Sequence, residues 1–378
     1  MKHVIALDVS KGKSTVVIYD RYRQCEFEGE LNHTRVDFER LHERIKEITR
    51  LDGQAPEIIF EATGVYSKPV EKFFIDFGYT YCRMNPLEAN LQMASMRRNK
   101  TDISDAHELA KTHFKMEREP TYVQDDYYEQ MRALTRYYDE IDEEVTLLKS
   151  RMHALLQVSF PELEKLITPR SALFLNIVQL YPHPALLLAH SKTMIKNRLK
   201  VNTRKNLSLA RAEAKAEVLL EAAQNSYPAI QENDIRCDQI RDYAARIMDL
   251  VEKKEFIVKQ MVEMSEGRNE YEVLRSIPGI DIMRYQSGNT QYRDRINKRG
   301  NKKLRKILYF MICTMITLRK KTDNHLVDYY NKLKTQPQRK PHKVAIVACI
   351  NKFLKMAFQL LTHGTLYDYE SALPAQKS

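Results

Sequence analysis

The first strand-like run of the chain contains a carboxylate, and this feature constrains the fold more than any other. Residues 4–9 read Val-Ile-Ala-Leu-Asp-Val, so Asp8 stands in a segment that is otherwise suited to burial. An unpaired carboxylate inside an apolar strand is costly, because burial removes its hydration. Asp8 is therefore a candidate functional residue, and its alternative role is that of an ordinary acid beside a turn.

The first 115 residues alternate short strands with helices. The runs 4–9 and 14–19 are rich in β-branched residues and flank Gly12, which predicts a hairpin. The further elements that the pattern predicts are a strand at 25–31, a helix at 38–48, a buried strand at 57–61, a helix at 70–77 and a strand at 79–83. Three strands and a helix, followed by strands alternating with helices, is the order of a ribonuclease-H-like α/β domain.

Three more candidate carboxylates lie further along the predicted ribonuclease-H-like domain. Glu61 closes a buried strand, and Asp102 and Asp105 are three residues apart on one helical face. Brought together with Asp8, they would repel one another unless divalent cations lay between them. Hard oxygen ligands select Mg²⁺ or Mn²⁺, and two such ions can stabilise the attacking and leaving oxygens at a phosphate. Alternatively, each acid singly is a cap, a strand end or a turn residue. His107 is expected to neighbour this site rather than to bind metal.

Residues 284–306 form a strongly basic segment around a serine. They contain nine Lys or Arg and one acid, a net charge of +8 in 23 residues, with Ser287 and Gly288 near the start. A glycine lets the neighbouring hydroxyl stand clear on a tight backbone, and the positive charge suits nucleic acid phosphates. Ser287 is thus a candidate nucleophile, with a solvated basic loop as the alternative. The candidate nucleic-acid-binding residues are Arg97, Arg98, Lys100, Arg284, Arg293, Arg295, Lys298, Arg299, Lys302 and Lys303.

The middle of the chain, residues 116–272, is nearly free of glycine and follows helical spacing. Apolar residues step by three and four from Met131 to Leu155, which is an a/d seam of more than three heptads. A second seam over 240–261 includes Val251 and Val258. Two such helices could pair within one chain or between protomers as a coiled coil, and an ordinary helical bundle is the alternative.

Composition narrows the class of protein. The net charge of +11 favours an acidic partner, and five scattered cysteines without zinc-ligand spacing favour a reducing cytosol. No stretch approaches the run of about 18 apolar residues that would span a membrane. The N-terminal sequence turns acidic too early for a signal peptide. We therefore expect a cytoplasmic protein with no membrane partner.

The chain resembles a known family of recombination proteins. Its motifs Phe60–Gly64, Asn99–Ala106 and Ile296–Asn301, together with Ser287, are similar to those of insertion-sequence transposases. These have an N-terminal Asp-Glu-Asp-Asp (DEDD) RuvC-like domain and a C-terminal serine domain. Piv-type DNA invertases are relatives, and some members are guided by a bridge RNA. The resemblance extends over nearly the whole chain.

The resemblance implies a RuvC-like domain over 1–115, a helical coiled-coil domain over 116–272 and a mostly helical serine transposase domain over 273–378. It implies that Mg²⁺ or Mn²⁺ is held by Asp8, Glu61, Asp102 and Asp105. Ser287 would attack a DNA phosphodiester and form a covalent phosphoserine link during site-specific recombination. The implied partners are double-stranded DNA at the element ends and target, a guide RNA, and copies of the chain in a dimer or tetramer, in the bacterial cytoplasm.

One segment departs from the family pattern. Residues 276–280 resemble the start of a helix-hairpin-helix, but Ile280 runs almost directly into Gln286-Ser287-Gly288, where the family has a further glycine and a helical segment. A deletion between two short repeats would leave this sequence and a shortened C-terminal domain. Two other functions stay open. A hydrolytic nuclease of the Holliday-junction type would use the carboxylates without Ser287, and a catalytically impaired nucleic-acid-binding remnant would use neither site.

Overall fold

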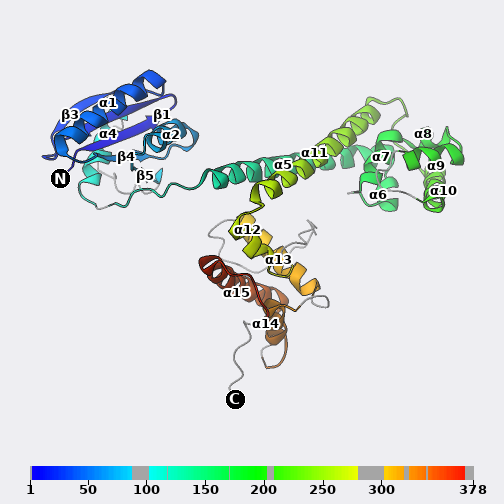
Figure 1. Ribbon diagram of the computed structural model, residues 1–378. Helices are drawn as coiled ribbons and strands as arrows, with labels where there is room; N and C mark the ends of the chain where they lie inside the picture. Colours follow the sequence, from blue (N-terminus) through cyan, green and yellow to red (C-terminus); the bar gives the residue numbers. More distant parts are fainter. Residues whose placement is uncertain are drawn as a thin grey trace, which may run out of the picture. The chain divides into compact units, whose positions relative to one another are not determined.

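The computed structural model divides the chain into two compact units, Met1–Glu129 and Gln130–Ser378. Figure 1 shows their helices and strands. It describes residues 2–86, 102–116, 118–169, 171–201, 208–279, 302–318, 323–337 and 339–370, without the side chains of residues 102 and 302. Each unit is described by itself below.

The first unit contains a five-stranded sheet of order β3-β2-β1-β4-β5. Its strands are β1 (Val4–Ser10), β2 (Lys13–Tyr19), β3 (Cys25–Asn32), β4 (Glu57–Glu61) and β5 (Cys82–Met84). The predicted hairpin is confirmed, because β1 and β2 pair antiparallel around Gly12, which has a φ of 77°. β1 pairs parallel with β4 on its other side. The last strand begins at Cys82 rather than at residue 79.

Different helices cover the two faces of this sheet, because side chains alternate along a strand. One face, with Leu7 and Phe60, packs under α1 (Arg35–Asp52) and α2 (Lys68–Asp76), which follows the short helix η1 (Gly64–Ser67). The other face packs against α4 (Asp102–His113), where Val4, Ala6 and Ile59 meet Ala106, Leu109 and Ala110. An α/β layer arrangement is therefore present, as the sequence predicted.

Local signals place α1 where the pattern predicts it. The side chain of Thr34 accepts a hydrogen bond from the Asp37 backbone amide at the first turn, as a helix N-cap does. Gly53 ends the helix in the left-handed conformation, with a φ of 70°. Between them the apolar residues at helical spacing are buried against the sheet, namely Leu41, Ile45 and Ile48.

The helical middle is built on two long helices, α5 (Asp126–Ser159) and α11 (Ile235–Ser265). Between them in sequence lie α6 (Leu163–Leu166), α7 (Ala172–Leu180), α8 (Pro184–Leu188), α9 (Lys192–Val201) and α10 (Leu209–Asn225). These helices share one apolar core, in which Ile141, Val145, Leu148 and Met152 of the first predicted seam are buried. The long helices are also joined within the chain by the Arg246–Glu144 ion pair, at 3.0 Å.

The second predicted seam is wrong at two positions. Val251 and Val258 are 37% and 44% exposed, whereas the preceding residues Leu250 and Ile257 are 8% and 3% exposed and belong to the core. Both sites offer two adjacent apolar residues, so helical spacing alone does not decide which one faces inward. Packing against the other helices decides it, since Leu250 and Ile257 belong to the apolar core that these helices share. Lys254, between the two sites, pairs with Asp142 of α5 and lies over the Tyr138 ring.

The C-terminal helices form a separate apolar core. They are α12 (Asn269–Arg275), α13 (Lys302–Thr317), α14 (His325–Lys334) and α15 (His342–His363). Within the described ranges, α15 is the one helix long and apolar enough to cross a membrane. Core helices also meet that test, and Ala345, Ile346 and Cys349 of α15 are fully buried in the core.

Candidate active site

Asp8 and Glu61 lie at the carboxyl ends of neighbouring parallel strands. Leu7 of β1 is opposite Phe60 of β4, so the two acids follow at the next position of each strand. Because Leu7 and Phe60 pack under α1 and α2, alternation places Asp8 and Glu61 on the other face, which α4 covers. Both carboxylates are half-buried there.

The helix α4 crosses this face in the direction opposite to β1 and β4. At its end, His113 places Nε2 2.7 Å from the carboxylate of Glu57, the first residue of β4. Asp105 precedes His113 by about 12 Å of helix axis, and Glu61 follows Glu57 by about 13 Å of strand. The half-buried Asp105 therefore lies at the same end of the sheet as Asp8 and Glu61.

Three of the four predicted carboxylates thus share one face and one end of the sheet. Asp102 begins α4, one turn before the buried Ala106, and its side chain lies outside the described residues. Among the side chains that the structure describes, no three His, Cys, Asp or Glu stand close enough to hold a metal ion. The donor set nevertheless fits a hard cation in its chemistry, because carboxylate oxygens are the ligands that Mg²⁺ takes.

Two histidines of α4, His107 and His113, contact strands of the sheet, and the sequence did not predict these contacts. His107 lies 2.8 Å from the Tyr19 hydroxyl and 2.8 Å from the Glu28 carboxylate, so it contacts β2 and β3 rather than the candidate metal ligands. His113 contacts Glu57 at the start of β4. The only signal in the sequence was the presence of two histidines in the predicted helix. Their partners lie on β2, β3 and β4, so identifying them required the order of the strands.

Burial shifts the pKa values of two groups in these contacts. It raises the pKa of Tyr19, so the phenol stays protonated near neutral pH. It lowers the pKa of the His113 imidazole, and the Glu57 carboxylate opposes this shift. Since the side chain of His113 is 4% exposed, its contact with Glu57 is shielded from solvent on the imidazole side.

Two family models match the chain. Residues 5–161 match a model of the DEDD domain of IS110 elements, described as Transposase, and residues 257–331 match one described as Transposase IS116/IS110/IS902 family. This chain carries the two domains of an IS110-family transposase. The first match includes the four predicted carboxylates, and the second includes Ser287.

Other comparisons add little to the assignment of this transposase. T. thermophilus RuvC in complex with Holliday junction substrate is similar to it at 11% identity, with 30% of this chain and 93% of that chain covered. The TM-score of 0.23 is too low to carry an argument. Comparison with curated proteins gives no significant match.

Most of the predicted nucleic-acid-binding residues of the transposase lie outside the described residues, as does Ser287. These basic residues are Arg97, Arg98, Lys100, Arg284, Arg293, Arg295, Lys298 and Arg299. Lys302 opens α13, but its side chain is also outside the described part. Lys303 forms an ion pair with Asp139 of α5. An exposed ion pair of this kind is worth about 0–1 kcal/mol, so a phosphate could replace the carboxylate.

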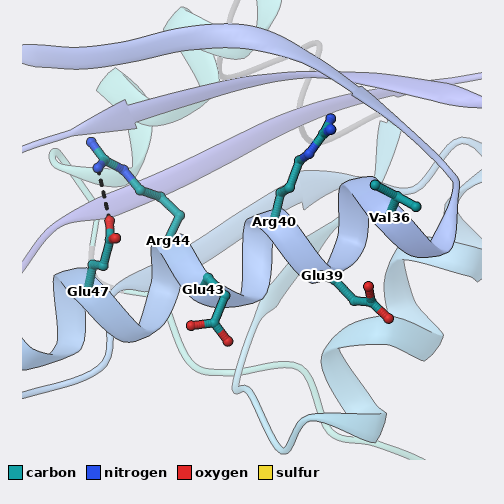
Figure 2. Close-up of a pocket in the computed structure, with 6 residues that line it drawn as sticks. All are labelled: Val36, Glu39, Arg40, Glu43, Arg44 and Glu47. Atoms are coloured by element: carbon teal, nitrogen blue, oxygen red, sulfur yellow. Dashed lines mark hydrogen bonds and ion pairs between the residues drawn. The ribbon is translucent and has the colours of Figure 1, made fainter.

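A pocket on α1 is unrelated to the carboxylates. Figure 2 shows it along the outward side of the helix, where Arg44 and Glu47 form an ion pair at 3.1 Å. Its lining residues are Val36, Glu39, Arg40, Glu43, Arg44 and Glu47. Because α1 covers the face of the sheet opposite to α4, this pocket does not extend the candidate active site.

Proposed function

We propose that this transposase catalyses site-specific recombination of insertion-sequence DNA through a metal-assisted serine nucleophile. The observation that carries the proposal is the placement of Asp8 and Glu61 on adjacent parallel strands, with Asp105 of α4 at the same end of the same face. With Asp102, these carboxylates would hold Mg²⁺ or Mn²⁺.

The chemistry requires activation of the serine. A serine hydroxyl is a poor nucleophile at neutral pH without a base or a metal, and no His/Asp pair lies near Ser287 in the sequence. When bound, Mg²⁺ supplies stabilisation of charge on the phosphate oxygens. The Ser287 hydroxyl loses its proton as its oxygen forms a bond to phosphorus. The bond to the leaving DNA oxygen breaks, and that oxygen takes up a proton and departs as a hydroxyl.

The covalent link explains how strands are rejoined without ATP. A phosphoserine bond conserves the energy of the phosphodiester, so attack by a new DNA hydroxyl re-forms the phosphodiester and releases the serine. Basic residues of the segment 284–306 neutralise the phosphate as it is displaced. The proposed partners are double-stranded DNA, a guide RNA and further protomers in a dimer or tetramer, with the carboxylates from one protomer and the serine from another.

The test is covalent trapping. Purified full-length protein with its co-purified RNA is incubated with Mg²⁺ and end-labelled DNA carrying the junction of the element's end, and products are separated on a denaturing gel. We expect a labelled protein band that is lost in Ser287→Ala and in Asp105→Asn. Matched controls are Thr290→Ala, which removes a hydroxyl from the same basic segment, and Glu43→Gln, which changes an exposed carboxylate of α1 on the opposite face of the sheet. Both controls should keep the band.

The two alternative functions give different gels. Cleaved DNA without a protein adduct, unaffected by Ser287→Ala but lost in Asp105→Asn, would indicate the hydrolytic nuclease. DNA binding without either product would indicate a remnant that the shortening after Ile280 has inactivated. In that event a variant with a helical segment restored after Ile280 is assayed in the same way, and return of the band would assign the defect to the shortening.

A further inference from the structure

The side chain of His107 joins α4 to two neighbouring strands. Its Nδ1 lies 2.8 Å from the hydroxyl of Tyr19, the last residue of β2, and its Nε2 lies 2.8 Å from a carboxylate oxygen of Glu28 in β3. The Tyr19 ring also meets the imidazole edge-on, at 5.7 Å between centroids. One side chain of α4 is therefore held by two polar contacts and one ring contact.

The two partners of His107 determine which ring nitrogen donates and which accepts a hydrogen bond when the imidazole is neutral. A carboxylate only accepts hydrogen bonds, so Nε2 carries the proton that is donated to Glu28. For the neutral imidazole, Nδ1 is then the acceptor, and the Tyr19 hydroxyl donates to it. Both contacts are satisfied at once, which restricts rotation of the ring.

The helix geometry connects His107 to the candidate metal ligands. Successive residues of an α-helix are about 100° apart around its axis, so Asp105 and His107 lie on opposite flanks of α4, with Ala106 between them. Ala106 is fully buried against the sheet. Since His107 contacts β2 and β3, the flank that carries Asp105 faces the opposite direction, toward β4 and Glu61.

We propose that His107 is a positioning residue that sets the rotation of α4, and thereby the placement of Asp105 relative to Asp8 and Glu61. This inference rests on the proposed metal site. Ala106, Leu109 and Ala110 pack on the sheet through apolar contacts, which are not directional. The directional contacts with Tyr19 and Glu28 restrict rotation of the helix about its axis at its middle, two residues from Asp105, whereas the contact between His113 and Glu57 acts at its C-terminal end.

The test compares metal binding with fold stability in the full-length protein. Mn²⁺ binding is followed by electron paramagnetic resonance of the free ion, and melting is followed in the same buffer. The variants are Tyr19→Phe, which keeps the buried ring and removes only the hydroxyl, and Glu28→Ala. The matched control is Glu30→Ala. Glu30 lies on the same strand and pairs with Lys13 at 2.5 Å, but is not among the contacts of His107.

We expect Tyr19→Phe and Glu28→Ala to raise the Kd for Mn²⁺ by about 10-fold, in the range seen when partners of metal ligands are removed. Glu30→Ala should leave it unchanged, and the three melting temperatures should agree closely. Glu28→Gln, which keeps an acceptor oxygen, should restore most of the affinity. This restoration would not follow from a general loss of packing.

Other outcomes overturn the inference in distinguishable ways. If the unaltered protein and Asp105→Asn bind Mn²⁺ equally, the proposed metal site is wrong, and the positioning role fails with it. If the unaltered protein binds Mn²⁺ in an Asp105-dependent manner while Tyr19→Phe and Glu28→Ala keep full affinity, the metal site stands and His107 does not position it. A loss of affinity that merely parallels a loss of melting temperature would show a general structural role.

Discussion

Nε2 of His113, the last residue of α4, lies 2.7 Å from Oε2 of Glu57, the first residue of β4. This contact fixes the direction of α4 across the sheet, and so determines at which end of the sheet its N-terminal acids lie. The contact also makes the stability of the first unit depend on pH, because the His113 imidazole is buried.

Stability of the first unit should fall as pH drops below about 6.5. Burial lowers the pKa of His113 from its ordinary value of 6.5, and Glu57 opposes this in part. The unfolded chain therefore binds more protons than the folded one between the lowered pKa and 6.5, and stability decreases with falling pH. We expect the melting temperature to decline from about pH 7 to about pH 5.5, and less steeply in His113→Gln. Burial also lowers the pKa of His33, which leaves a residual slope. Equal slopes in both proteins would contradict the prediction.

The buried face of α11 can be tested with two adjacent residues. Ile257 is 3% exposed and packs in the core, whereas Val258 is 44% exposed. Ile257→Ala should reduce the free energy of unfolding by about 2–5 kcal/mol, because it leaves a cavity, and Val258→Ala should change it by less than about 0.5 kcal/mol. Urea unfolding followed by circular dichroism measures both. The reverse order would support the heptad register that sequence spacing favoured.

Gly279 should tolerate alanine poorly. Its φ is 93°, and a Cβ there would lie 2.7 Å from Cγ and 3.3 Å from Cα of Met315 in α13. Gly279→Ala should therefore destabilise the second unit by about 2–3 kcal/mol, through backbone strain and a clash. Gly267→Ala is the matched control in the same unit, since its φ is 78° but nothing lies within 4 Å. Gly267→Ala should reduce the free energy of unfolding by about 1–2 kcal/mol. Equal losses on urea unfolding would mean that Met315 moves aside freely.

The thiols should react with alkylating reagents in order of burial. Burial raises the pKa of Cys349 to about 11, and the residue is fully buried, so the reactive thiolate is scarce and shielded. Cys25 is exposed. Iodoacetamide labelling followed by mass spectrometry should modify Cys25 in the folded protein and Cys349 only after denaturation. Rapid labelling of Cys349 in the folded state would show that the C-terminal core opens readily.

Local sequence signals located most elements of the first unit, although β5 begins three residues later than they predicted. The β-branched runs and Gly12 predicted the hairpin, and helical spacing of Leu41, Ile45 and Ile48 predicted the buried face of α1. These signals work because the pleat of a strand and the pitch of a helix are set by neighbouring residues along the chain. The same locality explains the failure at Val251 and Val258, where two adjacent apolar residues satisfy the pattern equally well.

For the candidate site, too, some features follow from the sequence and others only from the tertiary structure. The sequence by itself determined which acids to consider, because Asp8 interrupts an apolar strand, Glu61 ends another, and Asp102 and Asp105 share a helical face. Only the tertiary structure decided that β1 lies beside β4. It also decided that α4 crosses the face that carries Asp8 and Glu61, in the direction opposite to these two strands. The contacts of His107 with Tyr19 and Glu28 likewise join residues 88 and 79 positions apart. Strand order and helix docking arise from contacts between distant segments, which no local periodicity encodes.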